Sequence, residues 1–258
     1  MLPAQKLFGL VGGSLKNTFS KDYFTQKFAK QNLPYAYQNF ELESIDQLIP
    51  LITKNKNLFG LNITIPFKES VIPYLHQLDE SAAKIGAVNC IKINRTPHQF
   101  ELIGYNTDSF GFKVSLQKFI PPNFSSSALI LGTGGASKAA QFVCNELQID
   151  FTLVTSKLVN SHSHLINYHE INKDILANNL LVINTTPLGM FPHVHLFPPI
   201  DYDAISGNHF CFDLIYLPEE TAFLKKAKQQ GAKIKNGLEM LNEQANRAFD
   251  IFVANQLV

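Results

Sequence analysis

The sequence predicts an α/β protein built from two domains. Short apolar strands alternate with amphipathic helices along most of the 258 residues, a pattern that indicates α/β architecture. The segment 118–127, "KFIPPNFSSS", divides this pattern into two runs with a diproline and a serine cluster. In the second run the strands are nearly all apolar, which is typical of a parallel sheet covered on both faces.

The first run contains strands and helices in turn. Strands are expected over 6–13, 33–42 and 58–67, helices over 20–33 and 44–55, and a helix that passes through Gly86 into a strand over 81–93. Ser44 is the expected N-cap of the second helix, since its hydroxyl can accept from a free N–H of the first turn. In the third strand Ile63, Ile65 and Phe67 alternate with polar residues, and Pro66 ends the strand because it has no N–H.

The second run repeats this order. Strands are expected over 128–132, 150–155, 180–186 and 209–216, and helices over 135–147, 219–231 and 237–256. One face of the first of these helices carries Ala136, Ala139, Ala140, Val143 and Leu147. The apolar stripe of the last helix consists of Leu238, Leu241, Ala245, Phe249 and Phe252. Both helices are therefore expected to pack with one face on the protein core.

Composition limits the possible function classes. Hydrophobic residues make up 45% of the chain and charged residues 17%, so a packed core is available. A formal net charge of +1 and the lack of a basic cluster argue against nucleic acid as a partner. No apolar stretch approaches the roughly 18 residues needed to cross a bilayer. The N-terminus has no signal-peptide pattern, so a cytoplasmic protein without a membrane partner is expected.

Cysteine and histidine spacing does not indicate a metal site. The three cysteines are far apart in the sequence, which predicts buried, reduced thiols. Histidines occur in pairs at 162/164 and 193/195, but neither pair has a third ligand nearby. We therefore expect no bound metal.

A glycine-rich turn joins the strand at 128–132 to the following helix. Gly132, Gly134 and Gly135 let the backbone approach a pyrophosphate, whose charge the free N–H groups of the helix N-terminus can bind. Ser137 stands where the dinucleotide-binding fingerprint has its third glycine or alanine, and the alternative is a purely structural tight turn. The strand before, the helix after and a second strand about 20 residues on predict a Rossmann-like, doubly wound domain that binds a dinucleotide.

The end of the next strand indicates which dinucleotide is bound. Thr155, Ser156 and Lys157 occupy this position, where an acidic residue would bind the ribose of NAD and an arginine the 2′-phosphate of NADP. Without an acid nothing repels the phosphate, and Lys157 and two hydroxyls can attract it. NADP is therefore the expected cofactor, and NAD remains possible.

Lys68 and Asp108 stand at separate strand ends in the first run, with Asn89 between them in the sequence. A lysine and a carboxylate beside a dinucleotide domain suit a substrate site. The alternative for Lys68 is a solvated loop residue, and spacing alone does not bring the two side chains together.

Seven motifs in order resemble the shikimate dehydrogenase family over nearly the whole chain. They are "NITIPFK" (62–68), "GAVN" (86–89), "GYNTD" (104–108), "GTGGAS" (132–137), "NTTPLGM" (184–190), "DLIY" (213–216) and "NGLEMLNEQA" (236–245). The resemblance implies reduction of 3-dehydroshikimate to shikimate with NADPH, in the pathway to aromatic amino acids. It also implies a substrate domain over 1–108, joined by the C-terminal helix 238–258, and a Rossmann-like cofactor domain over 109–237.

Individual site residues are implied by the same resemblance. Lys68 matches the catalytic lysine and Asp108 its partner. The matches to substrate-binding residues are Thr18, Ser20, Thr64, Asn89, Tyr216 and Gln244. The matches to cofactor contacts are Gly132, Thr133, Gly134, Gly135, Ala136, Ser137, Thr155, Ser156, Lys157, Leu214, Gly237 and Glu80. In the reductive direction a protonated lysine can stabilise charge on the carbonyl oxygen and donate the proton, and a carboxylate nearby favours the charged ammonium.

Structural roles are the alternatives at several of these positions. Thr18 and Ser20 are also suited to an ordinary helix N-cap, and Asn89 to fixing a turn. Tyr216 can be a half-buried core aromatic, and Gln244 a solvated residue on the polar face of its helix.

The sequence departs from the family at two places. Thr18 replaces the first serine of its S-x-S motif, and the arginine expected after the second strand of the cofactor domain is missing. Two other functions therefore remain: an NAD-dependent quinate/shikimate dehydrogenase, or an inactive dinucleotide-binding regulatory module. Loss of Lys68 and Asp108 would mark the module, and both are present. A monomer and a homodimer are both compatible with the sequence.

Overall fold

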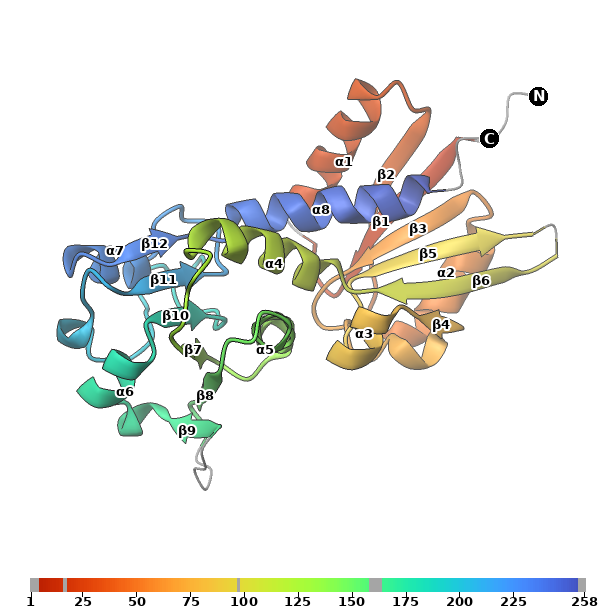
Figure 1. The fold of residues 1–258 in the computed structure, drawn as a ribbon. Helices are drawn as coiled ribbons and strands as arrows, with labels where there is room; N and C mark the ends of the chain where they lie inside the picture. The colour runs from red at the N-terminus through yellow and green to blue at the C-terminus, as the bar shows by residue number, and fades with distance from the viewer. Residues whose placement is uncertain (1–4, 16–17, 97, 158–163, 255–258) are drawn as a thin grey trace. The chain divides into compact units, whose positions relative to one another are not determined.

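The computed structural model describes residues 5–15, 18–96, 98–157 and 164–254 (Figure 1). The chain divides into two compact units. The first comprises the residues up to Thr107 together with those from Ala245 onward, and the second runs from Asp108 to Gln244. The division passes through two helices, α4 (Thr107–Phe119) and α8 (Leu238–Val253). The segment 118–127 lies inside the second unit, where it comprises the last two residues of α4 and the connection to β7, so the units do not divide there.

The first unit contains a six-stranded sheet in the order β2-β1-β3-β5-β6-β4. Its strands are β1 (Lys6–Gly12), β2 (Tyr35–Glu41), β3 (Leu58–Ile63), β4 (Gln77–Leu78), β5 (Cys90–Arg95) and β6 (Phe100–Tyr105). Strand β1 pairs in parallel with β2 and β3, whereas β5 runs antiparallel to β3 and β6. The helices are α1 (Phe19–Lys30), η1 (Ile45–Gln47), α2 (Leu48–Lys54), η2 (Ile72–Tyr74) and α3 (Glu80–Ile85).

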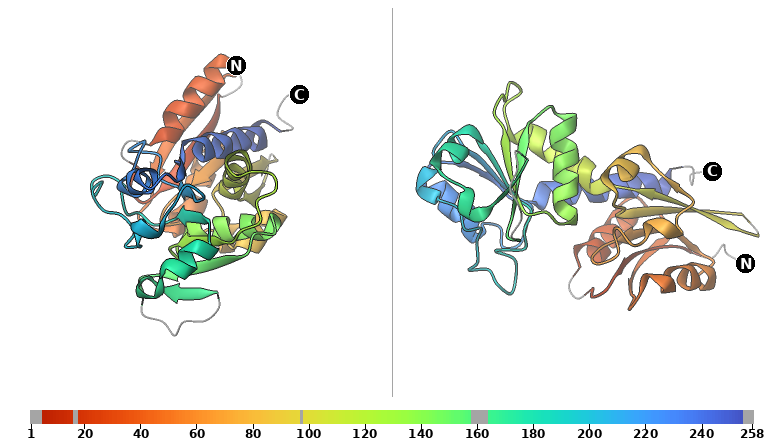
Figure 2. Two further views of the ribbon diagram at one scale, coloured as in Figure 1. Left: turned by 60° about the vertical axis from the view of Figure 1, so that its left-hand side comes forward. Right: turned by 90° about the horizontal axis from the view of Figure 1, so that it is seen from below.

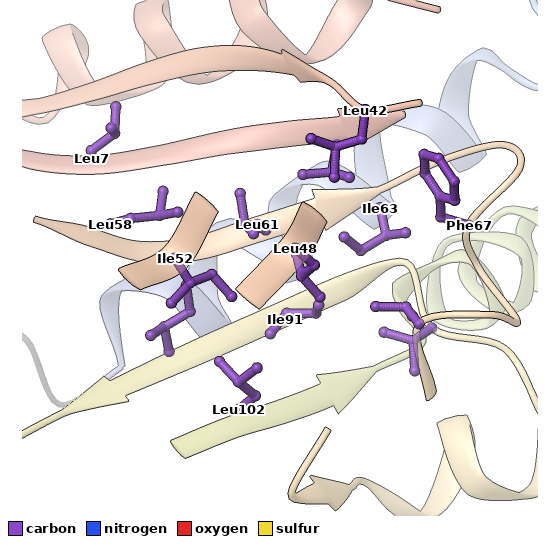
Figure 3. Close-up of a cluster of buried hydrophobic side chains, with 14 of the residues drawn as sticks. Leu7, Leu42, Leu48, Ile52, Leu58, Leu61, Ile63, Phe67, Ile91 and Leu102 are labelled. Carbon is purple, nitrogen blue, oxygen red and sulfur yellow. The ribbon is translucent and has the colours of Figure 1, made fainter. Parts of the chain in front are cut away.

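Two apolar clusters cover the faces of this sheet. On one face Leu48 and Ile52 of α2 pack with Leu61 and Ile91 (Figure 3). On the other face Phe8 of β1 packs with aromatic rings from α1 and the final turns of α8: Phe24, Phe28, Phe249 and Phe252. Gly60 permits this packing, because a Cβ there would lie 2.5 Å from the ring of Phe252.

The third strand is shorter than predicted. It ends at Ile63, and the chain then turns so that the Phe67 N–H bonds the Thr64 carbonyl at 2.9 Å. Ile65 was expected to alternate into the core but is 76% exposed. Pro66 has no N–H and cannot donate to a neighbouring strand, so it is suited to this turn and not to a continued strand. The loop that leads to Lys68 begins here.

The second unit has an all-parallel sheet in the order β12-β11-β10-β7-β8-β9. Its strands are β7 (Ala128–Leu131), β8 (Phe151–Thr155), β9 (Leu165–Asn167), β10 (Leu181–Asn184), β11 (Phe210–Asp213) and β12 (Lys233–Lys235). The remaining helices are α5 (Gly135–Glu146), η3 (Tyr168–Glu170), α6 (Lys173–Asn178), η4 (Tyr202–Ala204) and α7 (Ala222–Gln229). Sequence patterns did not predict β4, β9, β12, α4 or α6, most of which are very short or lie at a sheet edge.

Helices lie on both faces of this sheet, which confirms the doubly wound fold (Figure 2). Phe112 of α4 and Val143 of α5 belong to the core of one face, and Leu176 of α6 and Phe223 of α7 to that of the other. In α5 the predicted face is confirmed except at Ala136, which is exposed. The stripe of α8 is buried at Ala245, Phe249 and Phe252, but Leu238 is 44% exposed.

The expectations about cysteines, metals and membranes can be compared with the described residues. All three cysteines are buried free thiols. Within the ranges that the structure describes, no group of three or more His, Cys, Asp or Glu side chains is arranged to hold a metal ion; His162 lies outside those ranges. No helix in the same ranges has the length and apolarity to cross a membrane.

Candidate active site

In the first unit the predicted residues follow the carboxyl ends of β1 and β3. Thr64 comes directly after β3, and its N–H bonds the Val11 carbonyl of β1 at 2.9 Å. Four residues on, the carbonyl of Lys68 accepts from the Val88 N–H at 2.8 Å. Lys68 is partly buried. The loop that carries the lysine is therefore bound to the residue that precedes Asn89.

Asn89 is buried and holds the start of α4. Its Oδ1 accepts from the Thr107 N–H at 2.6 Å, and its Nδ2 lies 3.0 Å from Thr107 Oγ1. These bonds give Asn89 a structural role, but the group that it fixes is the first residue of a helix and not a turn. Asp108 follows in the first turn of α4, where the helix dipole favours a carboxylate. Asn89 therefore positions the backbone from which Asp108 extends.

Thr18 and Ser20 are partly buried at the start of α1. Thr18 occupies the N-cap position, but its side chain makes no capping bond and Oγ1 instead accepts from Asn39 Nδ2 at 2.9 Å. Ser20 hydrogen-bonds with Tyr37, whose hydroxyl donates to Asn62 Oδ1 at 2.8 Å. The N-cap alternative is therefore wrong for the Thr18 hydroxyl. Both hydroxyls are oriented by side chains of β2.

Tyr37, Asn39 and Asn62 were missed at the sequence level. They are polar residues within strands β2 and β3, and two of them are fully or nearly buried: Tyr37 is 4% and Asn62 6% exposed. Burial raises the pKa of Tyr37 well above its ordinary value, with a smaller contribution from Cys90 and an opposing one from the bond to Ser20. The signal that could have found them is a polar side chain on a strand face that is otherwise apolar.

In the second unit the glycine loop lies at the reversal of strand order. Counted from β7, the order is 3-2-1-4-5-6, and a doubly wound sheet forms its ligand crevice where the first and fourth strands end. Gly132 follows β7 with φ of 107°, and a Cβ there would lie 2.9 Å from Thr185 Oγ1. Thr185, just after β10, donates from Oγ1 to the Leu131 carbonyl at 2.7 Å. Only glycine suits both this backbone angle and this close approach.

Helix α5 begins without a side-chain cap. Gly134 is its N-cap residue and makes no capping bond from a side chain; a Cβ there would meet nothing within 4 Å. Thr133, Gly134, Gly135 and Ala136 are exposed. Ser137 is buried, and its Oγ lies 3.0 Å from Gln141 Nε2, so a serine is accommodated where the fingerprint has glycine. The exposed N–H groups of this first turn fit a phosphate.

The segment after β8 offers one hydroxyl rather than two. Thr155 is buried, and its Oγ1 accepts from the Lys157 N–H at 3.2 Å. Ser156 and Lys157 are exposed.

The loop after β11 packs against the start of α8. A Cβ on Gly237 would lie 2.1 Å from the Leu214 carbonyl oxygen, and the Gly237 N–H bonds the Ile215 carbonyl at 3.0 Å. Tyr216 is 37% exposed and thus lies outside the core. The backbones of Leu214 and Gly237 are therefore in contact, and the two residues form one continuous surface.

Gln244 and Glu80 have local contacts of their own. Gln244 is partly buried; its Nε2 donates to the Leu241 carbonyl at 3.0 Å, and its backbone lies against Gly111 of α4. Glu80, in the first turn of α3, forms a 2.6 Å ion pair with Lys84, and this bond lowers the pKa of its carboxyl. Glu80 and Lys84 are both exposed.

A buried carboxylate, Asp213, was also missed at the sequence level. It ends β11, is fully buried, and accepts from Thr221, Ile215 and Asn184. Burial raises its pKa to about 6 against the opposing effect of these three bonds. An aspartate at the end of an otherwise apolar strand was the available signal.

Residues 10–91 match the family model described as the shikimate dehydrogenase substrate binding domain. The chain is 36% identical over 260 residues to shikimate dehydrogenase (NADP(+)) of Methanosphaera stadtmanae, covering 95% of this chain and 90% of the relative.

Solved structures of shikimate dehydrogenases are similar to this chain in both fold and sequence. A shikimate dehydrogenase from Peptoclostridium difficile has a TM-score of 0.81 at 35% identity, over 98% of this chain and 94% of the other. A shikimate dehydrogenase in complex with NADP+ has a TM-score of 0.80 at 31% identity, over 98% and 92% of the two chains.

Proposed function

The chain belongs to the shikimate dehydrogenase family, and we propose that it catalyses the reversible, NADP-dependent reduction of 3-dehydroshikimate to shikimate. The observation that carries this proposal is the match over 95% of the chain to a relative of that activity. The reaction would serve the pathway to aromatic amino acids.

The second unit is suited to the dinucleotide. Its reversal of strand order, the uncapped N-terminus of α5 and the open space at Gly134 fit a pyrophosphate against backbone N–H groups. NADPH, when bound, supplies the hydride. Ser156 and Lys157 are exposed at the end of β8, where the 2′-phosphate is expected, and Leu214 and Gly237 form one packed surface for the other end of the cofactor.

Lys68 and Asp108 are proposed to manage the proton. During reduction the carbonyl oxygen gains negative charge, which the Lys68 ammonium stabilises and then neutralises by donating its proton. Asp108 favours the charged lysine and helps to return a proton to it afterwards. The reverse reaction uses the same groups in the opposite direction.

The substrate is proposed to bind through polar side chains. Thr18 and Ser20 would donate to its carboxylate, and their fixed partners Asn39 and Tyr37 hold the two hydroxyls in place. The ring hydroxyls would contact the remaining predicted residues, Thr64, Asn89, Tyr216 and Gln244. Neutral donors bind an anion here without the cost of a buried cation.

An assay at 340 nm tests the function. Shikimate and quinate are each offered with NADP+ and NAD+, and we expect the fastest turnover with shikimate and NADP+. Faster turnover of quinate with NAD+ would instead identify the quinate/shikimate enzyme. A folded protein that binds cofactor but turns over neither substrate would be the inactive module.

A double-mutant cycle tests the catalytic pair. If Lys68 and Asp108 act as a unit, Lys68→Ala, Asp108→Asn and the double variant should lower kcat by similar factors. Losses that multiply in the double variant would show that the two residues act independently.

A further inference from the structure

We propose that Asp213 is a positioning residue that holds the loops after β10 and β11 in the arrangement that binds the cofactor. The proposal rests on the dinucleotide site of the proposed function and concerns how that site is held in place. Asp213 itself is buried, so its action passes through the backbone that it bonds.

The carboxylate bonds three segments that are separate in the sequence. Its Oδ2 accepts from Thr221 Oγ1 at 2.6 Å, at the N-cap of α7. Its Oδ1 accepts from the Ile215 N–H at 3.0 Å, within the loop after β11, and from Asn184 Nδ2 at 3.1 Å, at the end of β10. All three donors point at one side chain, so the ionised carboxylate satisfies them together.

Asn184 extends the network into the loop after β10. Its Oδ1 accepts from the N–H of Thr186 at 3.0 Å and from the hydroxyl of the same residue at 2.7 Å. The neighbouring Thr185 bonds the end of β7 next to Gly132. Asp213 is thus connected, through two residues, to the glycine loop as well as to Leu214 and Tyr216.

Asp213 is a costly group to bury in its charged form. Asp213, Asn184 and Thr221 are all 0% exposed, and within the described residues Asp213 bonds hydrogen-bond donors without a cationic partner. A buried charge without a counter-ion is costly, and a neutral side chain would spare the fold this cost. Retaining the charge is reasonable where it orients polar loops around a ligand.

The groups facing Asp213 are neutral near pH 6. Tyr202 of η4 interacts electrostatically with it, and Tyr168 and Cys211 interact with Tyr202. Burial raises the pKa of Cys211 and Tyr168 to about 12, and burial also raises that of Tyr202. Asp213 is therefore the member of this group that changes charge between about pH 5 and 7.

Protonation of Asp213 would disturb the loops. The added proton needs an acceptor, and the nearest oxygen, Thr221 Oγ1, donates its own proton to Asp213 Oδ2. One donor of the network is then left without its acceptor. Cofactor affinity should accordingly fall as the pH drops through about 6, in addition to any effect of the 2′-phosphate itself.

The test measures NADPH binding by its fluorescence between about pH 5.5 and 8.5, without shikimate. Asp213→Asn should bind on the order of tenfold more weakly at pH 8, the loss expected when buried hydrogen bonds are mispaired, and should lack the acid step. Thr221→Val should move the step to higher pH, because the Thr221 bond lowers the pKa of Asp213. Thr221→Ser should behave like wild type.

Controls separate positioning from folding. Asp201→Asn removes a capping carboxylate at η4 in the same unit and should leave NADPH binding unchanged. Wild-type affinity and an unchanged acid step in Asp213→Asn would overturn the proposal. If that variant does not fold, identical profiles of Thr221→Val and Thr221→Ser would overturn it. A wild type that binds NADPH but does not turn over shikimate would refute the proposed reaction and leave this test intact.

Discussion

The two sheets present different kinds of group at their carboxyl edges. At the edge of the first unit the groups are side chains, and each is oriented by another side chain: Asn39 bonds Thr18, and Tyr37 bonds Ser20. At the edge of the second unit the groups are mostly backbone N–H, presented by a loop in which Gly132 and Gly134 have no side chain to interfere. One edge presents oriented side-chain groups, and the other presents backbone groups.

This difference predicts how each edge responds to mutation. A substitution in the first unit should remove one specific contact or one chemical step. A substitution in the second unit should act through backbone geometry, and its effect should depend on how closely neighbouring atoms approach the new Cβ.

Lys68→Ala should give the largest effect, because this side chain is the one proposed to transfer the proton. We expect kcat to fall by about 10² to 10⁴, with a much smaller change in KM for shikimate. The exposed Lys54→Ala, in the last turn of α2, is the matched control and should be silent. A near-normal kcat with a large rise in KM would show that Lys68 only binds substrate.

The glycine loop offers a matched pair. Gly132→Ala should destabilise the fold by about 1–3 kcal/mol and weaken NADPH binding, since its φ of 107° disfavours alanine and the new Cβ meets Thr185. Gly134→Ala has open space and should cost the fold less, about 0.5–1 kcal/mol, because alanine is a poorer N-cap residue than glycine. Denaturant unfolding and NADPH titration measure both. Equal stability losses would contradict the role given to local geometry.

Substitutions at Thr18 test whether a single hydroxyl of the first unit binds the substrate. Thr18→Val should weaken shikimate binding by roughly 1–3 kcal/mol, and Thr18→Ser should be mild, because serine keeps the group that Asn39 orients. KM for shikimate and thermal unfolding are compared in the two variants. If Thr18→Val loses stability but retains KM, the hydroxyl serves the fold and does not bind the carboxylate.

Cofactor preference should give the smallest effect. Lys157 is exposed, and such a charge contributes about 1 kcal/mol or less, so NADP should be preferred over NAD by about tenfold in kcat/KM. The preference should shrink at high salt, and Ser156→Arg should widen it with a bidentate phosphate ligand. Ratios of kcat/KM at low and high salt decide this, and a wild-type preference for NAD would refute it.

Local sequence patterns correctly predicted those elements whose structure depends on neighbouring residues. The strand, glycine turn and helix from 128 to 147 follow from contiguous residues, and the structure confirms them. The end of β3 was wrong by several residues, because a proline turn followed a pattern that continues to alternate.

Contacts between distant residues were not predictable from local patterns. Asn89 bonds Thr107 across 18 positions, and Asp213 bonds Asn184 across 29. No spacing rule pairs such residues, because the sheet order that brings them together is decided by packing of the whole unit. The resemblance to a family supplied site residues, but it did not supply the partners that hold them.

The discontinuity of the first unit has a consequence for how the chain acquires its structure during synthesis. Residues 108–244 form a contiguous unit and can fold once they have emerged. The first unit, although made earlier, obtains Ala248, Phe249 and Phe252 only from the last helix, where they complete the core with Phe8, Phe24 and Phe28. Until then the rings of Phe8, Phe24 and Phe28 lack the part of their cluster that α8 supplies. The N-terminal half of the protein is thus expected to be the last part to reach its native state, and the most exposed to aggregation on the ribosome.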